Sequence, residues 1–147
     1  MRRVATILVL HGPNLNLLGV REPEIYGRTT LAEIDASLAA LAAELGVGID
    51  CFQSNHEGAL IDRIQGARGH VTAIVINPGA FTHTSYALAD ALAAYDGVKV
   101  ELHLSNTAAR EEWRRTSVVG PVVTGTVAGF GRTGYRLAVE AAIASLP

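Results

Sequence analysis

The strict alternation of short β-branched runs with longer helical stretches most restricts how this 147-residue chain can fold. Several of the apolar runs are nearly continuous, which is typical of parallel strands that helices cover on both faces. The predicted strands cover residues 4–11, 47–53, 72–77, 98–104 and 122–129. The predicted helices cover residues 31–45, 57–67, 84–95, 109–115 and 133–145. Right-handed crossovers then favour a single flavodoxin-like, doubly wound α/β domain with a five-stranded parallel sheet in the order 2-1-3-4-5.

Composition excludes several classes of protein. Hydrophobic residues make up 49% of the chain, which argues against a disordered protein. Its net charge is only −2, so it lacks the positive charge that binding to nucleic acid or to an anionic membrane surface requires. The mainly apolar run over residues 4–10 is far shorter than the roughly 20 residues of a membrane span. The single cysteine, Cys51, cannot form an internal disulfide and fits a reducing cytoplasm, and we interpret it as a core residue with no base nearby. We therefore expect one cytoplasmic domain over residues 1–147, without nucleic-acid or membrane partners.

The first predicted strand is followed by an unusually long loop, residues 12–28. In a doubly wound sheet, ligands bind outside the carboxyl ends of the strands, at the point where the strand order reverses. This loop carries Asn14, Arg21 and Tyr26 at that end, and we expect residues 19–28 to form a lid with a cation and a phenol. The alternatives are a bend residue at Asn14 and a solvated loop with an Arg–Glu pair.

The third and fourth predicted strands end in further polar residues. Alternation along the fourth strand places Glu101 and His103 on one face, where the carboxylate can orient the imidazole and favour its use as a general acid. A buried ion pair without catalytic role is the alternative. Asn77 ends the third strand, and the helix after it, capped by Thr82 or Thr84, starts at the same edge of the sheet.

Several familiar cofactor and metal motifs are missing from the sequence. It has no P-loop, no H-E-x-x-H, no C-x-x-C and no G-x-G-x-x-G after the first strand. We therefore expect neither a cofactor nor a metal ion. Lys99, the only lysine, is the sole candidate for an imine, but it lies toward the start of its strand, away from the expected crevice. The chemistry that remains is proton transfer. Tyr26 can act as the base if the positive charge of Arg21 favours its phenolate, and His103 can act as the acid. Asn77 can stabilise an enolate intermediate by hydrogen bonding. These residues indicate a lyase or isomerase for a small anionic carbonyl compound.

Segments in order along nearly the whole chain resemble type II 3-dehydroquinate dehydratases. They are HGPNLNLLGVREPEIYG, FQSNHEGALID, VINPGAFTHTS, VELHLSN, AREEWR and GFGRTGY. The first is the most specific. The resemblance implies dehydration of 3-dehydroquinate to 3-dehydroshikimate by anti elimination through an enolate, in the shikimate pathway or in quinate breakdown. It also implies a homo-oligomer, a dodecamer of four trimers.

The resemblance also implies roles for individual residues. Tyr26 corresponds to the proton-abstracting base, Arg21 to the lid arginine that activates it, and Asn14 to an asparagine near the enolate. His103 corresponds to the proton donor and Glu101 to its support. The positions that align with substrate-binding residues are Asn77, His83, Asp90, Leu104, Ser105 and Arg114. Because Asp90 lies about 10.5 Å along a helix from His83, we expect it to serve the site of a neighbouring subunit.

The chain departs from the pattern of this family at Thr107, Ala108 and Gly120. We expect these departures to change affinity or subunit contact rather than chemistry. Two other functions stay open at this point. One is a non-catalytic flavodoxin-like module, which predicts lost site residues. The other is a lyase or isomerase that uses the same residues on a different keto acid.

Overall fold

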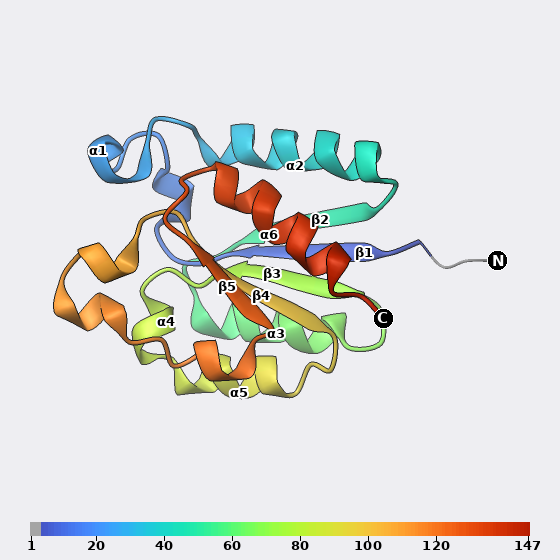
Figure 1. The fold of residues 1–147 in the computed structure, drawn as a ribbon. Coiled ribbons are helices and arrows are strands. Elements are labelled where there is room, and N and C mark those ends of the chain that lie inside the picture. The colour runs from blue at the N-terminus through green and yellow to red at the C-terminus, as the bar shows by residue number, and fades with distance from the viewer. Residues whose placement is uncertain (1–3) are drawn as a thin grey trace.

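Five parallel strands form one sheet in the order β2-β1-β3-β4-β5, which confirms the predicted architecture (Figure 1). The structure is a computed structural model that describes residues 4–147, so residues 1–3 of the expected domain lie outside it. The strands are β1 (Thr6–His11), β2 (Gly48–Gln53), β3 (Ala73–Asn77), β4 (Val98–His103) and β5 (Gly125–Ala128). All five point their carboxyl ends to the same edge, where β1, β3 and β4 end in His11, Asn77 and His103.

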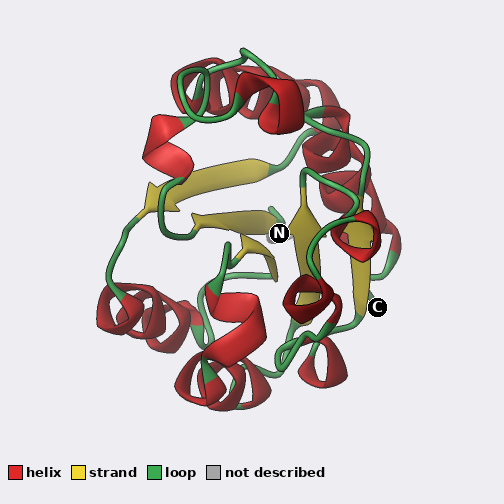
Figure 2. Ribbon diagram, turned by 90° about the vertical axis from the view of Figure 1, so that its left-hand side faces the viewer, coloured by secondary structure: helices red, strands yellow, loops and turns green. Residues whose placement is uncertain are grey.

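Helices cover the sheet on both sides, as Figure 2 shows from the carboxyl ends of the strands. One face packs against α2 (Leu31–Leu45) and α6 (Thr133–Ala144), and the other against α3 (Glu57–Ala67) and α5 (Tyr86–Ala93). Shorter helical turns lie in the loops: α1 (Pro23–Tyr26), α4 (Phe81–Thr84), η1 (Leu15–Leu17), η2 (Thr107–Ala109), η3 (Glu112–Arg115) and η4 (Gly120–Val122). Within residues 4–147, none of the helices combines the length and the apolar character that crossing a bilayer requires.

The hydrophobic core has two halves because neighbouring residues of a strand point to opposite faces of the sheet. In β1, Ile7 and Val9 belong to the half under α2 and α6, whereas Leu8 and Leu10 belong to the half under α3 and α5. All four side chains are almost fully buried. Burial on both faces explains why the strands read as continuous apolar runs.

The helix over residues 31–45 forms as predicted. The Thr30 hydroxyl accepts a hydrogen bond from the Glu33 backbone N–H at 3.2 Å and donates one to the Glu33 carboxylate at 3.1 Å, which completes a capping box. Gly46 ends the helix in the left-handed conformation, at a φ of 69° that a residue without Cβ adopts at little cost.

Two helix predictions need correction. The helix predicted over residues 84–95 is interrupted at Ser85, whose extended backbone separates α4 from α5. Ser85 caps α5 by accepting a hydrogen bond from the Leu88 N–H at 3.0 Å, so neither Thr82 nor Thr84 is the cap. The helix predicted over residues 109–115 is wrong. Arg110 is extended there, between η2 and η3, and its side chain is held by distant partners.

Candidate active site

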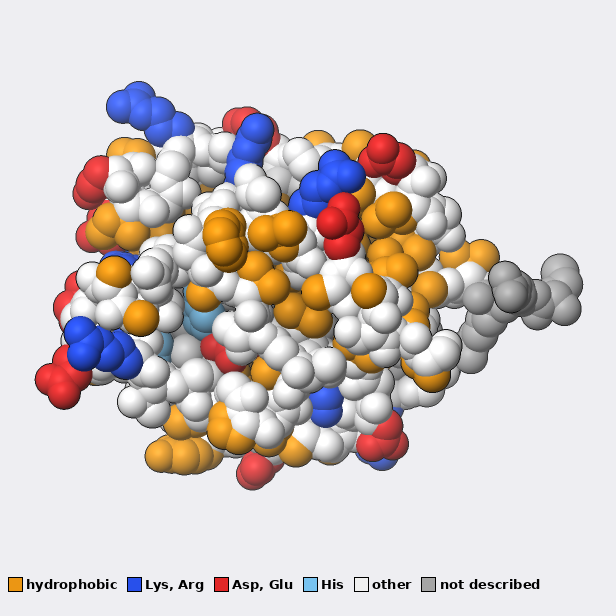
Figure 3. All heavy atoms as spheres, in the orientation of Figure 1, with side chains coloured by type: hydrophobic (Ala, Val, Ile, Leu, Met, Phe, Trp, Pro, Cys, Tyr) orange, Lys and Arg blue, Asp and Glu red, His pale blue; other side chains and the backbone are white. Residues whose placement is uncertain are grey.

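A cavity of about 220 Å³ opens at the carboxyl ends of β1, β3 and β4, where the sequence analysis expects the site. Figure 3 shows pale-blue histidine atoms set back below the surface at this end of the molecule. The cavity lining includes nine of the predicted site residues: Asn14, Arg21, Tyr26, Asn77, His83, His103, Leu104, Ser105 and Arg114. Segments far apart in the chain therefore supply one site.

Glu101 and His103 form a buried pair at the base of the cavity. The His103 Nε2–H donates to the Glu101 carboxylate at 2.5 Å, and the exposed fractions of the two residues are 8% and 1%. The pair leaves Nδ1 of His103 as the ring nitrogen available to a bound molecule. The predicted contact between these two residues is confirmed.

Two hydroxyl groups that the sequence analysis missed also hold Glu101. The Thr82 hydroxyl donates to its carboxylate at 2.7 Å, and the Ser117 hydroxyl donates at 3.0 Å. Burial would raise the pKa of Glu101, but hydrogen bonds from His103, Thr82 and Ser117 and the charge of His103 together lower it below its usual value. Glu101 therefore stays ionised and faces the imidazole as a fixed negative charge.

The lowered pKa makes Glu101 a source of pH-dependent stability. The ionised carboxylate favours the folded state, so its contribution is present above the pKa of an unfolded glutamate, about 4.3, and is lost as the pH falls through the lower folded pKa. We expect Glu101→Gln to be less stable at neutral pH and to lose less stability on acidification than the wild type. Urea midpoints measured from about pH 7 to about pH 3 test this. The exposed pair of Arg136 and Glu140 supplies the control variant Glu140→Gln, which should follow the wild type. Parallel pH curves for Glu101→Gln and the wild type would contradict the expectation.

Tyr26 lies between two arginines at the mouth of the cavity. The Arg21 guanidinium carbon is 4.8 Å from the centre of its ring. Arg110 donates a hydrogen bond from Nη1 to the phenol oxygen at 2.8 Å and another to the Ser105 hydroxyl at 3.3 Å. Two guanidinium groups from different segments therefore face this phenol.

Arg110 is the residue of this site that the sequence analysis undervalued. The sequence predicts a helix over residues 109–115 and assigns no role to Arg110. Nothing in the local pattern separates Arg110 from Arg114. A contact across 84 residues of sequence, from Arg110 to Tyr26, decides the conformation instead.

Asn77 and His83 present oriented polar groups to the cavity. The Asn77 side-chain oxygen accepts the Gly79 N–H at 3.1 Å, and the residue is 4% exposed. The His83 Nδ1–H donates to the Thr116 carbonyl at 2.6 Å, and its ring packs edge-on against Trp113 at 5.2 Å. Nε2 of His83 is therefore free to face a ligand.

Trp113 also organises Arg114. The Arg114 guanidinium carbon lies 4.1 Å from the centre of the Trp113 ring, and its Nε–H donates to the Glu111 carboxylate. Opposite this pair, Asn14 adopts a left-handed backbone with φ 69°, and its N–H donates to the Asn55 side chain at 2.9 Å. The cavity thus offers cations and amides for a small anion.

Two residues discussed from the sequence, Asp90 and Lys99, lie outside this cavity. Asp90 is exposed on α5 and does not line it. Lys99 donates to the carbonyls of Leu92 and Tyr95, at 2.8 and 2.6 Å, at the end of α5. That position at the start of β4 confirms the prediction that Lys99 lies away from the crevice.

Cys51 packs against the core under α2 and α6, as predicted, but the expectation of no nearby base is wrong. Possible metal-ligand atoms of His11, Asp35 and Cys51 all lie within 4.8 Å of one another. Burial, and after it the neighbouring Asp35 carboxylate, raise the pKa of the Cys51 thiol to about 12. The thiol is thus a poor anionic ligand, and both ring nitrogens of His11 already have hydrogen-bond partners.

Two of the three departures from the family pattern lie near the site. Thr107 lines the cavity. The Gly120 N–H donates at 2.8 Å to the Ser117 hydroxyl, which in turn donates to Glu101. A Cβ at position 120 would lie 3.3 Å from the Ser117 oxygen, so this glycine leaves room for Ser117 beside the carboxylate. Ala108 is exposed in η2 and does not line the cavity.

Comparisons with known proteins match this geometry. The family model described as dehydroquinase class II matches residues 5–143. The chain belongs to this family. A 3-dehydroquinate dehydratase of Desulforudis audaxviator is 59% identical over 93% of this chain and 91% of its own length. A catabolic 3-dehydroquinase of Aspergillus oryzae is 57% identical over 92% of this chain and 88% of its own length.

Solved structures agree with the family assignment. The crystal structure of a type II dehydroquinase from Butyrivibrio crossotus superposes with a TM-score of 0.94 at 44% identity. The superposition covers 95% of this chain and 98% of that one. The chain is therefore an enzyme with the type II dehydroquinase fold, which confirms the resemblance seen in the sequence.

Proposed function

We propose that this enzyme dehydrates 3-dehydroquinate to 3-dehydroshikimate by anti elimination through an enolate. The observation that carries the proposal is that Tyr26 and His103 line one cavity, the first on the loop after β1 and the second at the end of β4. A base and an acid on different elements suit an elimination in which the proton and the hydroxyl leave from opposite faces. Residues 19–28 then serve as the lid that brings Tyr26 to the substrate.

The proposed steps follow from the charges around the two groups. The Tyr26 phenolate, flanked by Arg21 and Arg110, takes a proton from the carbon beside the substrate carbonyl. The electron pair forms an enolate, which Asn14 and Asn77, or a water they hold, stabilise by hydrogen bonding. His103, protonated and held by Glu101, gives its proton to the departing hydroxyl, which leaves as water. The conjugated ketone remains as product.

The other cavity residues bind the substrate in this proposal. The carboxylate and hydroxyl groups of 3-dehydroquinate meet the free Nε2 of His83, the Leu104–Ser105 segment and the Arg114 guanidinium. Guanidinium groups pair strongly with carboxylates, which fits an anionic substrate.

An ultraviolet assay with purified enzyme tests the reaction, because only the dehydrated product contains a conjugated ketone. We expect activity to persist with borohydride present. The only lysine, Lys99, is held by two carbonyls away from the cavity and cannot form an imine there. Inactivation by borohydride in the presence of substrate would point to an imine mechanism. A panel of other keto acids separates this enzyme from one with a different substrate, and no turnover of any would favour a non-catalytic module.

We propose that the reaction serves the shikimate pathway, in aromatic amino acid biosynthesis, in the cytoplasm. The alternative is quinate catabolism. Among the similar proteins, one is named a 3-dehydroquinate dehydratase and another a catabolic 3-dehydroquinase. Deletion of the gene decides between them. Loss of growth without aromatic amino acids supports biosynthesis, whereas loss of growth on quinate alone supports catabolism.

We also propose a homo-oligomer, a dodecamer of four trimers, in which Asp90 serves the site of a neighbouring subunit. Asp90 and Tyr86 are one turn apart on α5, and Tyr86 is 73% exposed, so an aromatic ring and a carboxylate share an uncovered face. Tyrosine is enriched at protein–protein interfaces, which supports a subunit contact on this face.

Complementation tests the shared site. Asp90→Ala and His103→Ala chains are each expected to lose activity alone. Unfolded together and reassembled, they should recover activity, because some sites then receive an intact Asp90 and an intact His103 from different chains. Each variant reassembled with itself is the control. Mixtures no more active than either parent would contradict cross-subunit sharing.

A further inference from the structure

Three donors from three segments hold the Glu101 carboxylate. On β4, the His103 Nε2–H donates to Oε2 at 2.5 Å, and the Thr82 hydroxyl of α4 donates to the same oxygen at 2.7 Å. The Ser117 hydroxyl, in the loop between η3 and η4, lies 3.0 Å from Oε1 and 3.1 Å from Oε2. Glu101 and Thr82 are each 1% exposed, so the carboxylate depends on these donors rather than on solvent.

The loop that carries Ser117 is fastened to α4 on both sides of this residue. Before it, the Thr116 carbonyl accepts a hydrogen bond from His83 Nδ1–H at 2.6 Å. After it, the Val118 N–H donates to the Thr82 carbonyl at 2.7 Å. The two hydroxyl groups that hold Glu101 therefore belong to one connected support, which packs over the end of β4.

This support bears on which nitrogen of the imidazole faces the cavity. A carboxylate only accepts hydrogen bonds, so the ring nitrogen that contacts Glu101 carries a hydrogen, and that nitrogen is Nε2. Nδ1 is then the atom left for a molecule in the cavity, which His103 lines. A carboxylate held by His103 alone could turn about its side-chain bonds and carry the ring with it. The two hydroxyl groups remove that freedom.

We propose that Thr82 and Ser117 position the proton donor of the reaction, because they fix the Glu101 carboxylate that holds the His103 ring with Nδ1 toward the substrate. Neither Thr82 nor Ser117 lines the active-site cavity, so both are positioning residues that act through Glu101 and His103. The inference rests on the proposed dehydratase function, in which His103 is the acid. A purely structural role would lower stability and leave the proton of the imidazole where it is.

Thr82→Val and Ser117→Ala each remove one hydroxyl and keep most of the side chain. We expect kcat to fall about tenfold in Thr82→Val and about fivefold in Ser117→Ala, whose hydroxyl lies farther from the carboxylate. KM should stay within about twofold of the wild type, because neither residue contacts the substrate. Thr82→Ser keeps the hydroxyl and should retain most of the activity.

Gly120 allows the missing hydroxyl to be returned from another position. A Cβ there would lie 3.3 Å from the Ser117 oxygen, 3.4 Å from the Ser117 Cβ and 3.7 Å from Oε1 of Glu101. Ser117→Ala removes the nearest of these atoms, and the hydroxyl that Gly120→Ser introduces then has the reach to donate to Oε1. We expect Gly120→Ser to restore kcat in the Ser117→Ala chain to within about twofold of the wild type. Gly120→Ala in the same chain adds the Cβ without the hydroxyl and should restore nothing.

Two further measurements separate positioning from stability. Nitrogen NMR shifts of the His103 ring in the free enzyme show which nitrogen carries the proton of the neutral imidazole. We expect Nε2 alone in the wild type, and a mixture of both nitrogens in the chain with Thr82→Val and Ser117→Ala. In a His103→Ala background the same two substitutions should lower the remaining rate no further, because no ring is left to position.

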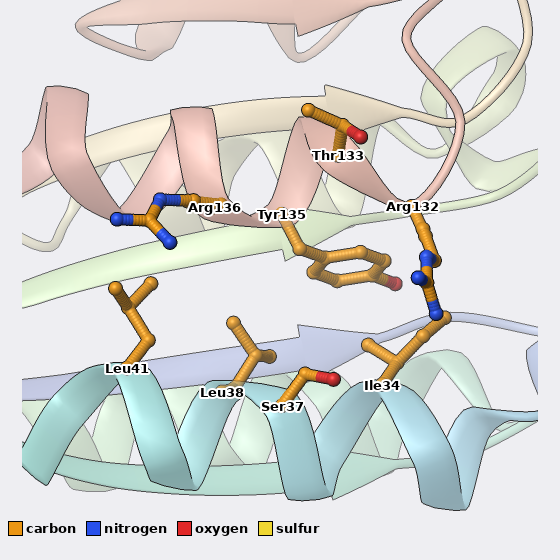
Figure 4. Close-up of a pocket in the computed structure, with 8 residues that line it drawn as sticks. All are labelled: Ile34, Ser37, Leu38, Leu41, Arg132, Thr133, Tyr135 and Arg136. Atoms are coloured by element: carbon orange, nitrogen blue, oxygen red, sulfur yellow. The ribbon is translucent and has the colours of Figure 1, made fainter.

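Ser37→Ala is the matched control for the loss of a hydroxyl. Figure 4 shows Ser37 on α2, at a cavity of about 260 Å³ between that helix and α6, on the face of the sheet opposite to Glu101. This variant should keep the kcat and the imidazole spectrum of the wild type.

Three results would overturn the inference: an unchanged kcat in the chain that lacks both hydroxyl groups, an imidazole in that chain protonated at Nε2 alone, or an equal loss of rate with and without His103. An inactive wild type would overturn the proposed function instead, and the NMR comparison would still show whether Thr82 and Ser117 orient the ring.

Discussion

Tyr26→Phe should lose activity by a factor of roughly 10³ or more while the fold stays intact, because phenylalanine keeps the ring but has no group to accept a proton. Two arginines lie near this phenol, Arg21 at 4.8 Å from the ring centre and Arg110 at 2.8 Å from the oxygen. The initial rate of formation of the conjugated ketone is the measurement.

The control for this variant is Tyr95→Phe, which removes a hydroxyl group that donates to the Val71 carbonyl at 2.6 Å, away from the active-site cavity. It should keep normal turnover. Circular dichroism and thermal unfolding then establish that both variants are folded. Near-normal turnover by folded Tyr26→Phe would remove this tyrosine from the mechanism and leave the cavity without a base.

His103→Ala should lower kcat by a factor of roughly 10² to 10⁴, because the departing hydroxyl then has no acid to protonate it. The substitution also removes the 2.5 Å hydrogen bond to Glu101, but Thr82 and Ser117 still hold that carboxylate, so the chain should fold. The space left by the ring allows a direct test, since added imidazole should restore part of the activity.

His70→Ala is the matched control for the acid. His70 is exposed in the turn between α3 and β3, at the opposite end of the sheet from the cavity. Its loss should leave kcat unchanged, and imidazole should have no effect on it. Full activity of His103→Ala without imidazole would exclude His103 as the proton donor.

Sequence reasoning succeeds where local chemistry and local periodicity coincide. Glu101 and His103 are two residues apart on a strand, so alternation alone places them together. Strand β1 is recognised by its apolar run and α2 by its capping box. It fails where contacts with distant segments determine the local backbone conformation. Arg110 is extended because its side chain meets Tyr26 and Ser105, and the sequence around it has the pattern of an ordinary helix.

The supports of the site follow the same division. Thr82 and Ser117 are 19 and 16 residues from Glu101 along the chain, and no spacing rule joins them to it. The hydrogen bonds that join Tyr135, His11 and Asp35 link three elements, and Cys51, interpreted from the sequence as an isolated core thiol, lies beside them. Such contacts depend on which helices pack on which face.

The sequence by itself determined the doubly wound sheet, the edge at which its chemistry lies and the residue types available there. Periodicity and strand order are local properties, and they carry this information along the chain. Only the tertiary structure decided that Arg110 joins Arg21 at Tyr26, that two hydroxyl groups hold Glu101, and that Tyr135 reaches His11. Each is a side-chain contact between segments whose proximity arises when the helices pack against the sheet.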